Sequence, residues 1–318
     1  MTEYGAVADG KTDCTEAFSR CVRAVIEAKG GQMFLPAGVY CGRIVIPPVG
    51  KPWVNIEIVG ELEPLQHFGT VGEWPLHDHG TILRCKDASG MSVITACPND
   101  NAEYETFSAV SVTIRNLDVR TYDNPGIGGI DLRRACQCRL ENVIVNTDVY
   151  NVLASEPTHE TCGIKTPACN NGAWTVLRNV TVTGYHTGIL VEEHTDGSNV
   201  VVASNVHGLR LVFAYHASHF ARVGAYRNTH NVTVEGAHAF SIAQLNTERP
   251  GPGQWSDRTA WQCAVTDVND PDNRGLGDIT YWVVVGAIGA QDIFTVKGGA
   301  GIRVRRIGDS GTNVERKA

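Results

Sequence analysis

A short unit, Asn followed by alternating apolar residues, recurs through the middle of this 318-residue chain. It reads RNLDVR, ENVIVN, RNVTVT, SNVVVA and HNVTVE, with its asparagines at positions Asn116, Asn142, Asn179, Asn199 and Asn231. Short β-runs that repeat at a loose period are typical of a β-solenoid, in which each repeat forms one coil. Asparagine suits a corner of such a coil because it tolerates the left-handed backbone region and can hydrogen-bond along a ladder.

A second series of short strands lies between these units, and it carries charged residues at regular places. The series reads GGIDLRR, CGIKTPA, TGILVEE and HGLRLVF. If each Ile or Leu after the glycine points inward, every second residue from the next one points outward. The outward charged residues are then Asp131, Arg133, Lys165, Glu192 and Arg210.

These charges should form one ladder on one face, because stacked strands are about 4.8 Å apart. Two carboxylates with one coil between them, such as Asp131 and Glu192, would lie roughly 9–10 Å apart by backbone spacing. That separation suits an inverting glycoside hydrolase, and a shorter one suits a retaining enzyme. The alternative interpretation is a mixed-charge ladder that serves cross-strand pairing and solubility.

Composition excludes some partners. The net charge is −7 and no Lys/Arg block is present, which argues against nucleic acid. No apolar run approaches the ~20 residues that span a bilayer, so no membrane partner is expected. No signal peptide precedes the chain, which predicts a cytoplasmic protein, or a secreted one if Met1 replaces a removed signal. The ten cysteines are expected to be core thiols, and neither a metal nor a cofactor is predicted.

The first 40 residues predict a helix followed by short strands. CTEAFSRCVRAVIEAKGG has apolar residues at helical spacing, with Asp13 as the expected N-cap, Glu16 completing a capping box, and Gly30-Gly31 at the end. This region resembles the N-terminal signature of pectate-lyase-superfamily proteins, which are right-handed parallel β-helices. The matching residues are Tyr4-Gly5-Ala6, Asp9-Gly10, Thr12-Asp13-Cys14-Thr15, Gly30-Gly31 and Leu35-Pro36-Ala37-Gly38-Val39-Tyr40.

The resemblance implies an all-β right-handed parallel β-helix with an N-terminal capping α-helix. We expect a single domain over residues 1–318, with the cap in residues 1–50 and the coils in residues 51–318. Members of the superfamily include polysaccharide lyases, polygalacturonase-like hydrolases, epimerases, fructan-cleaving transferases and phage tail spikes. Nearly all of them act on carbohydrate, so a poly- or oligosaccharide is the expected partner. A homotrimer is the expected assembly if the chain is spike-like.

Polygalacturonase-like relatives carry aspartates beside their Gly-Ile strands, and this chain matches them only in part. GGID keeps Asp131, ETCGI offers Glu160, and YHTGI places His186 near the histidine of that family. We expect Asp131 and Glu192 to be the catalytic pair, with Glu160 or Glu248 as substitutes.

Further residues are candidates for binding the substrate. Arg133, Lys165 and Arg210 would bind hydroxyls or a carboxylate of the sugar. His186 and His207 belong to a stretch that holds seven of the 11 histidines, which indicates a polar groove. Trp255, in a Pro/Gly-rich loop expected over residues 244–262, would either stack on a sugar ring or cap the end of the solenoid.

Three functions remain open from the sequence. The first is a glycoside hydrolase or transglycosylase that uses two carboxyl groups. The second is a polysaccharide lyase in which Lys165 or Arg210 removes the proton beside a uronate carboxylate. The third is a glycan-binding spike or adhesin module without catalysis.

Overall fold

The structure is a computed structural model, and beyond Leu245 it describes the backbone alone. The described residues are 1–61, 80–85, 91–98, 109–121, 126–147, 161–168, 174–212, 218–226, 228, 230–235, 239–248, 262–267, 276–283, 295–296, 301–307 and 313–317.

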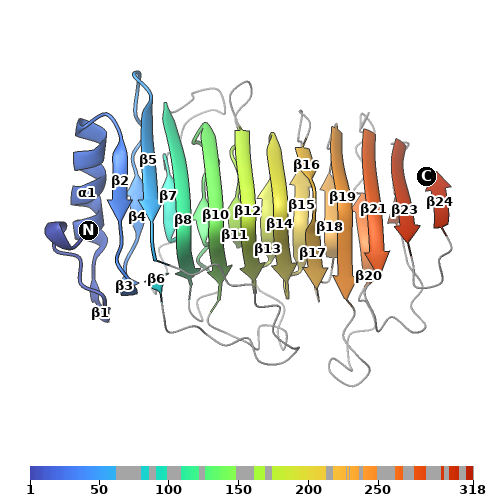
Figure 1. The fold of residues 1–318 in the computed structure, drawn as a ribbon, viewed down its shortest axis with the longest axis horizontal. Helices are drawn as coiled ribbons and strands as arrows, with labels where there is room; N and C mark the ends of the chain where they lie inside the picture. The colour runs from blue at the N-terminus through green and yellow to red at the C-terminus, as the bar shows by residue number, and fades with distance from the viewer. Residues whose placement is uncertain are drawn as a thin grey trace.

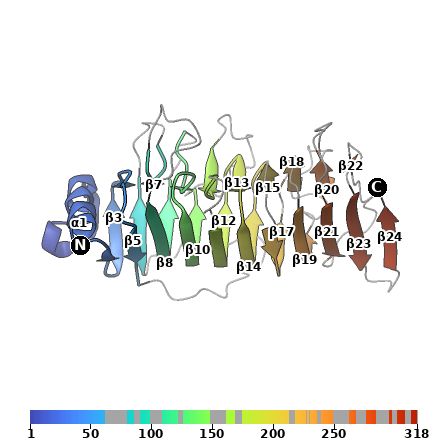
Figure 2. The same ribbon diagram turned by 90° about the horizontal axis from the view of Figure 1, so that it is seen from above.

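The described strands form two long sheets, and the chain passes back and forth between them (Figure 1). Sheet A has 15 strands and sheet B has nine, and all but one of their pairings are parallel. Successive coils stack along the long axis from α1 at one end to β24 at the other (Figures 1 and 2). The prediction of a right-handed parallel β-helix with an N-terminal helix is therefore confirmed.

Sheet A contains the asparagine repeats, and it ends where β24 pairs antiparallel with β23. Its strands are β1 (Asp9–Asp13), β2 (Gly31–Phe34), β3 (Gly38–Cys41), β5 (Val54–Val59), β6 (Thr81–Arg84), β8 (Val110–Arg120), β10 (Gln137–Asn146), β12 (Trp174–Thr183), β14 (Thr195–Ala203), β16 (Ser218–Phe220), β17 (Val223–Tyr226), β19 (Ala239–Glu248), β21 (Leu276–Val283), β23 (Gly301–Ile307) and β24 (Asn313–Lys317).

Sheet B contains the glycine-led strands and is built from shorter segments. Its strands are β4 (Ile44–Ile46), β7 (Ile94–Ala96), β9 (Ile130–Asp131), β11 (Cys162–Lys165), β13 (Thr187–Val191), β15 (His207–Val212), β18 (His230–Glu235), β20 (Gln262–Asp267) and β22 (Thr295–Val296).

A ladder of asparagines forms one corner of the solenoid. Asn116, Asn142, Asn179 and Asn199 all have φ between 52° and 55°, in the left-handed region. The side-chain amide of each of the last three donates to the side-chain oxygen of the asparagine one coil before, at 3.1, 3.0 and 2.9 Å. Because the strands are parallel and in register, each interior asparagine accepts a hydrogen bond from the asparagine on one side and donates one to the asparagine on the other.

The left-handed asparagine also interrupts the strand's alternation, so the inward-facing positions shift by one residue after the corner. In β8, Ile114 points inward before the corner, and Leu117 points inward after it. Leu117 continues a fully buried column through Val143, Val180 and Val200 on the next three strands. A single strand therefore contributes to two walls of the core.

One member of the predicted repeat lies elsewhere. Asn231 is in β18 of sheet B, where His230 pairs with His207 of β15. It is buried and accepts a hydrogen bond from the Asn228 side chain at 3.0 Å. The prediction that HNVTVE is a fifth corner unit was wrong, because the Asn-Val pattern is also compatible with the start of a sheet B strand.

Helix α1 (Thr15–Glu27) covers the first coil. Its inner face buries Phe18, whose ring centroid lies 6.4 Å from that of Tyr40 on β3. The N-cap is Cys14 rather than the predicted Asp13. Asp13 still accepts the backbone N–H of Thr15 at 2.9 Å, one residue nearer the helix start than a capping box requires.

The predicted partner of the cap, Glu16, does not reach back to it. Instead it forms ion pairs with Arg20 and Arg23 on the helix surface. The expectation for the cysteines holds among the described residues, where eight cysteines are free and seven of these are buried.

The asparagine ladder leads to a stability prediction. Asn142→Ala removes one donated and one accepted ladder bond and places an alanine at φ 54°. We expect it to lower the free energy of unfolding by about 2–4 kcal/mol, measured by urea denaturation. Asn142→Gly loses the same bonds but tolerates the backbone angle, so its loss should be smaller. Equal losses in the two variants would contradict a conformational role for asparagine.

Candidate active site

The inner face of sheet B is a column of apolar residues in register. Ile130, Ile164, Ile189 and Leu209 pair in sequence on β9, β11, β13 and β15, and all four are fully buried. The residues that follow them also pair in sequence, and these are Asp131, Lys165, Leu190 and Arg210. The predicted alternation, with the charged residues on the outer face, is confirmed.

A glycine precedes each of these apolar residues, and on β9 and β11 it is required because the opposite wall comes very close. A Cβ on Gly129 would lie 2.2 Å from Val145 Cγ1, and one on Gly163 would lie 2.2 Å from Val182 Cγ1. Real side chains do not approach so closely, so any larger residue would push sheet B away from the core. The glycines thereby fix the depth at which the charged face sits.

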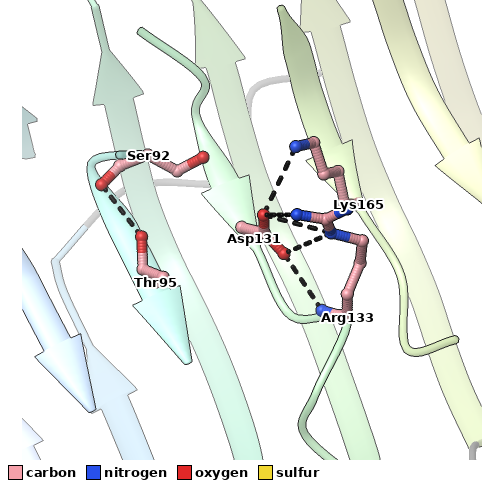
Figure 3. A network of polar contacts seen from close by, with 5 residues as sticks. All are labelled: Ser92, Thr95, Asp131, Arg133 and Lys165. Carbon is pink, nitrogen blue, oxygen red and sulfur yellow. Dashed lines mark hydrogen bonds and ion pairs between the residues drawn. The ribbon is translucent and has the colours of Figure 1, made fainter. Parts of the chain in front are cut away.

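Asp131 is the centre of an ion-pair network on this face (Figure 3). The Arg133 guanidinium donates to both of its carboxylate oxygens at 3.1–3.3 Å, and the Arg133 backbone N–H donates at 3.1 Å. Lys165 Nζ lies 3.4 Å from Asp131 Oδ2. Burial disfavours the charged carboxylate, but Lys165 and Arg133 together outweigh it and lower the pKa of Asp131. Asp131 is therefore ionised at neutral pH.

Glu192 follows β13 and lies in the same electrostatic cluster, but its pKa shifts in the opposite direction. Its backbone N–H donates to Thr166 Oγ1 at 3.3 Å. Its Oε2 atom is buried and has no hydrogen-bond partner among the described residues. Burial, reinforced by the Asp131 charge, raises the pKa of Glu192 to about 6, although Arg133, Lys165 and Arg210 oppose this rise. One cluster thus holds a strongly ionised carboxylate and a carboxyl group that protonates under mildly acidic conditions.

Three histidine rings extend this face toward the C-terminal coils. The centroid of His207 lies 5.3 Å from that of His186 and 4.9 Å from that of His230, and the second pair is stacked at 16°. His207 Nδ1 lies 2.8 Å from Thr233 Oγ1. Burial, together with His230, Arg210 and His186, lowers the pKa of His207 to about 3. His207 is therefore a neutral hydrogen-bonding group at ordinary pH.

The structure brings most of the predicted site residues together. Asp131, Arg133, Lys165, Glu192 and Arg210 interact electrostatically on sheet B. His207 lies beside Arg210 and, like His186, belongs to the same face.

The other predicted residues lie elsewhere or outside the described residues. Glu160 and Trp255 are outside the described residues. Glu248 is the last residue of β19 in sheet A, where its backbone pairs with Tyr226, so its strand is not part of the charged sheet. The loop predicted to start at residue 244 starts later, since residues 244–248 continue β19.

Sequence reasoning missed the roles of His230, Thr233 and Thr166. His230 aligns with His207, and Thr233 aligns with Arg210. The signal was available, because HNVTVE and HGLRLV both begin with histidine one residue before the sheet B glycine position. Grouping HNVTVE with the corner asparagines concealed it.

Neither a metal-binding cluster nor a membrane-spanning helix is found in the described part of the chain. No group of three or more His, Cys, Asp or Glu side chains there is arranged to hold a metal ion. No helix among those residues has the length and apolar character needed to cross a membrane.

Comparison with known proteins identifies the family. Residues 1–236 match the family described as rhamnogalacturonase A/epimerase, pectate lyase-like. The chain belongs to this family. The match covers the cap, the asparagine ladder and the charged face of sheet B, so the pectate-lyase-like resemblance is confirmed. No curated protein matches the sequence.

Several solved structures are similar to this pectate-lyase-like chain at low sequence identity. DFA-IIIase from Arthrobacter chlorophenolicus A6, solved in complex with DFA-III, is 11% identical with a TM-score of 0.56, covering 96% of this chain and 83% of that one. The exopolygalacturonase of Thermotoga maritima is 12% identical with a TM-score of 0.37, covering 100% and 94%. The A-module of the Azotobacter vinelandii mannuronan C-5 epimerase AlgE6 is 13% identical with a TM-score of 0.41, covering 96% and 98%. At these identities the likeness concerns the fold.

The buried Glu192 makes stability depend on pH. Its raised pKa means that the folded state loses stability as pH rises from about 4.5 to about 6, where the unfolded chain releases the proton first. The glutamine of Glu192→Gln resembles the protonated acid. Above pH 6 this variant should therefore have a free energy of unfolding about 1–2 kcal/mol higher than that of the wild type, and a higher melting temperature. Near pH 4 the two proteins should melt alike.

Thermal melts followed by circular dichroism between pH 4 and 8 would measure this difference. Glu141→Gln is the control, because Glu141 is ion-paired with Arg178 on sheet A. A melting difference between Glu192→Gln and the wild type that does not change with pH would contradict the raised pKa.

Proposed function

We propose that this protein cleaves glycosidic bonds of a poly- or oligosaccharide on the outer face of sheet B, as a glycoside hydrolase or transglycosylase. The observation that carries the proposal is the pair of carboxyl groups whose pKa values shift in opposite directions within one cluster. Glycosidases need one carboxyl group that carries a proton and one that is charged. Membership of a family described by carbohydrate-active enzymes supports a sugar substrate.

In this mechanism Glu192 is the general acid. Its buried carboxyl group holds a proton below about pH 6 and transfers it to the leaving glycosidic oxygen as the bond breaks. The unpartnered Oε2 atom is available for such a contact, since none of the described residues hydrogen-bonds to it. Leaving this acceptor without an internal partner costs stability, which a bound substrate hydroxyl would offset.

Asp131 is the charged carboxylate of the pair. It either activates a water molecule or attacks the sugar carbon, and in both cases it stabilises the positive charge of the oxocarbenium-like transition state. Arg133 and Lys165 hold it in one orientation through their ion pairs. Their remaining N–H groups, with Arg210 and the neutral His207, would bind substrate hydroxyls or a sugar carboxylate.

Elimination is the second candidate reaction. Lys165 and Arg210, the two candidate bases, lie on the same face in register, with Leu190 of β13 between them. We rank it second because Lys165 is engaged with Asp131 at 3.4 Å.

Replacement of either carboxyl group tests the proposed chemistry. Asp131→Asn and Glu192→Gln should each lower kcat/KM by about 100- to 10,000-fold with the fold retained, because each removes one proton-transfer or charge-stabilising group. The assay is a glycan library read by mass spectrometry, in which hydrolysis adds one water to the products. Arg178→Gln on sheet A is the matched surface control.

The products also separate the rival reactions. An unsaturated product without added water would show that the reaction is elimination and not hydrolysis. Glycan binding without turnover, unchanged in both carboxyl variants, would instead identify a binding module and overturn the proposal.

The pH profile tests the assignment of the acid. Because Glu192 must be protonated to act, kcat/KM should fall as pH rises above about 6. Asp131 stays ionised throughout that range, so it should not produce this decline. The measurement is the pH dependence of kcat/KM on the best substrate of the screen. An activity that rises steadily from pH 6 to 9 would contradict Glu192 as the acid.

A further inference from the structure

The outer face of sheet A carries a hollow that lies on a different sheet from the carboxyl cluster. It has a volume of about 600 Å³ and lies over β5, β8, β10 and β12, which are side by side in Figure 1. This volume is within the range of about 300–1,000 Å³ that is typical of ligand pockets. The side chains that line it include Asn55, Ser111, Thr113, Gln137, Arg139 and Trp174.

Strand register explains why a hollow forms here. Asn55 pairs with Ser111, and Gln137 pairs with Trp174, so these residues form one row across the four strands. The row spans three strand spacings of about 4.8 Å, or roughly 14 Å. Ser111 and Thr113 on β8 are short, whereas Trp174 and Arg139 on the neighbouring strands are long. The lining is therefore mostly polar, with Val176 as an apolar contribution beside Arg139, and an indole and a guanidinium stand above the short side chains.

Trp174 presents an aromatic face to solvent. Its residue is 53% exposed at the start of β12, although a large apolar side chain would normally be buried. Its ring stacks against His194 with centroids 6.1 Å apart and an angle of 28°, which fixes its orientation. An exposed, oriented indole beside amide and hydroxyl groups suits a sugar ring, whose apolar face stacks while its hydroxyls hydrogen-bond.

The charges around the hollow favour an acidic sugar. Glu57 is paired with Arg115, and Glu141 is paired with Arg178. Arg139 forms no ion pair among the described residues. In the row that runs from Arg139 through Val176, Asp196 lies two strands away. Glu57 and Glu141, on the strands that form the hollow, are thus ion-paired, whereas the Arg139 guanidinium has no such partner in the described part of the chain. A guanidinium binds carboxylates with two parallel hydrogen bonds.

We propose that this hollow is a second glycan-binding site, which holds a uronate-bearing segment of a polysaccharide. Trp174 stacks on one sugar ring, Arg139 binds a sugar carboxylate, and Gln137 with Asn55 hydrogen-bonds the hydroxyls. The two sheets face different directions around the solenoid (Figure 2), so this site holds a different stretch of polymer from the carboxyl cluster. It would keep a long chain attached to the protein between cleavage events.

The test measures binding of polygalacturonate to the full chain carrying Glu192→Gln, in which turnover is slowed. Adding Trp174→Ala should weaken binding about tenfold, through loss of the stacked ring. Adding Arg139→Gln should weaken it by a similar factor and reduce its dependence on salt. Trp53→Ala, which removes a tryptophan of equal exposure that does not line the hollow, and Arg178→Gln should change the affinity less than twofold.

Each other outcome overturns the proposal. The proposal fails if binding is unchanged in both Trp174→Ala and Arg139→Gln. It also fails if neutral dextran binds as tightly as polygalacturonate. A dimer that becomes monomeric in Trp174→Ala, measured by analytical ultracentrifugation, would identify a second copy of the chain as the occupant. Gln137→Ala replaces Trp174→Ala if the latter fails to fold. Because the readout is binding, its failure is distinguishable from failure of the proposed cleavage.

Discussion

Four asparagine side chains, each hydrogen-bonded to the next, keep the coils of this protein in register. An asparagine at φ near 54° turns the chain at the corner, and its amide group ties each coil to its neighbours. The apolar columns on either side of the corner depend on that register. So does the site, because Asp131 and Lys165 meet only if β9 and β11 stack without a slip. A shift by one residue would turn one of them into the core.

The charged face of sheet B shows how one cluster shifts the pKa values of two carboxyl groups in opposite directions. Cations contact Asp131 directly, so their field exceeds the cost of burial and its pKa falls. Glu192 has no such direct contact among the described residues, so burial dominates and its pKa rises to about 6. Distance and hydrogen bonding contribute to the difference, since Arg133 and Lys165 act on both carboxyl groups but contact only Asp131. Proton-transfer chemistry on a sugar requires this kind of asymmetry.

The two sheets offer different surfaces although they share one core. On sheet B the charges are close to one another and partly buried, which suits reaction chemistry. On sheet A most charges pair across strands, and an exposed indole with an unpaired guanidinium remains above short side chains. A solenoid can separate such roles because each wall is an independent surface, whereas every wall is held by the same inner columns.

The sequence by itself determined the solenoid, the asparagine corner and the outward direction of Asp131, Lys165 and Arg210, because these follow from repetition, local backbone preference and a period of two. The right-handed parallel β-helix followed from the resemblance of the first 40 residues to the pectate-lyase superfamily. It misplaced Asn231, since Asn-Val begins a strand as readily as it turns a corner. Only the tertiary structure decided which residues stack from coil to coil, because loops of unequal length hide that register. It also decided the opposite pKa shifts of Asp131 and Glu192 and the hollow beside Trp174, since burial and neighbouring charges depend on contacts between distant segments.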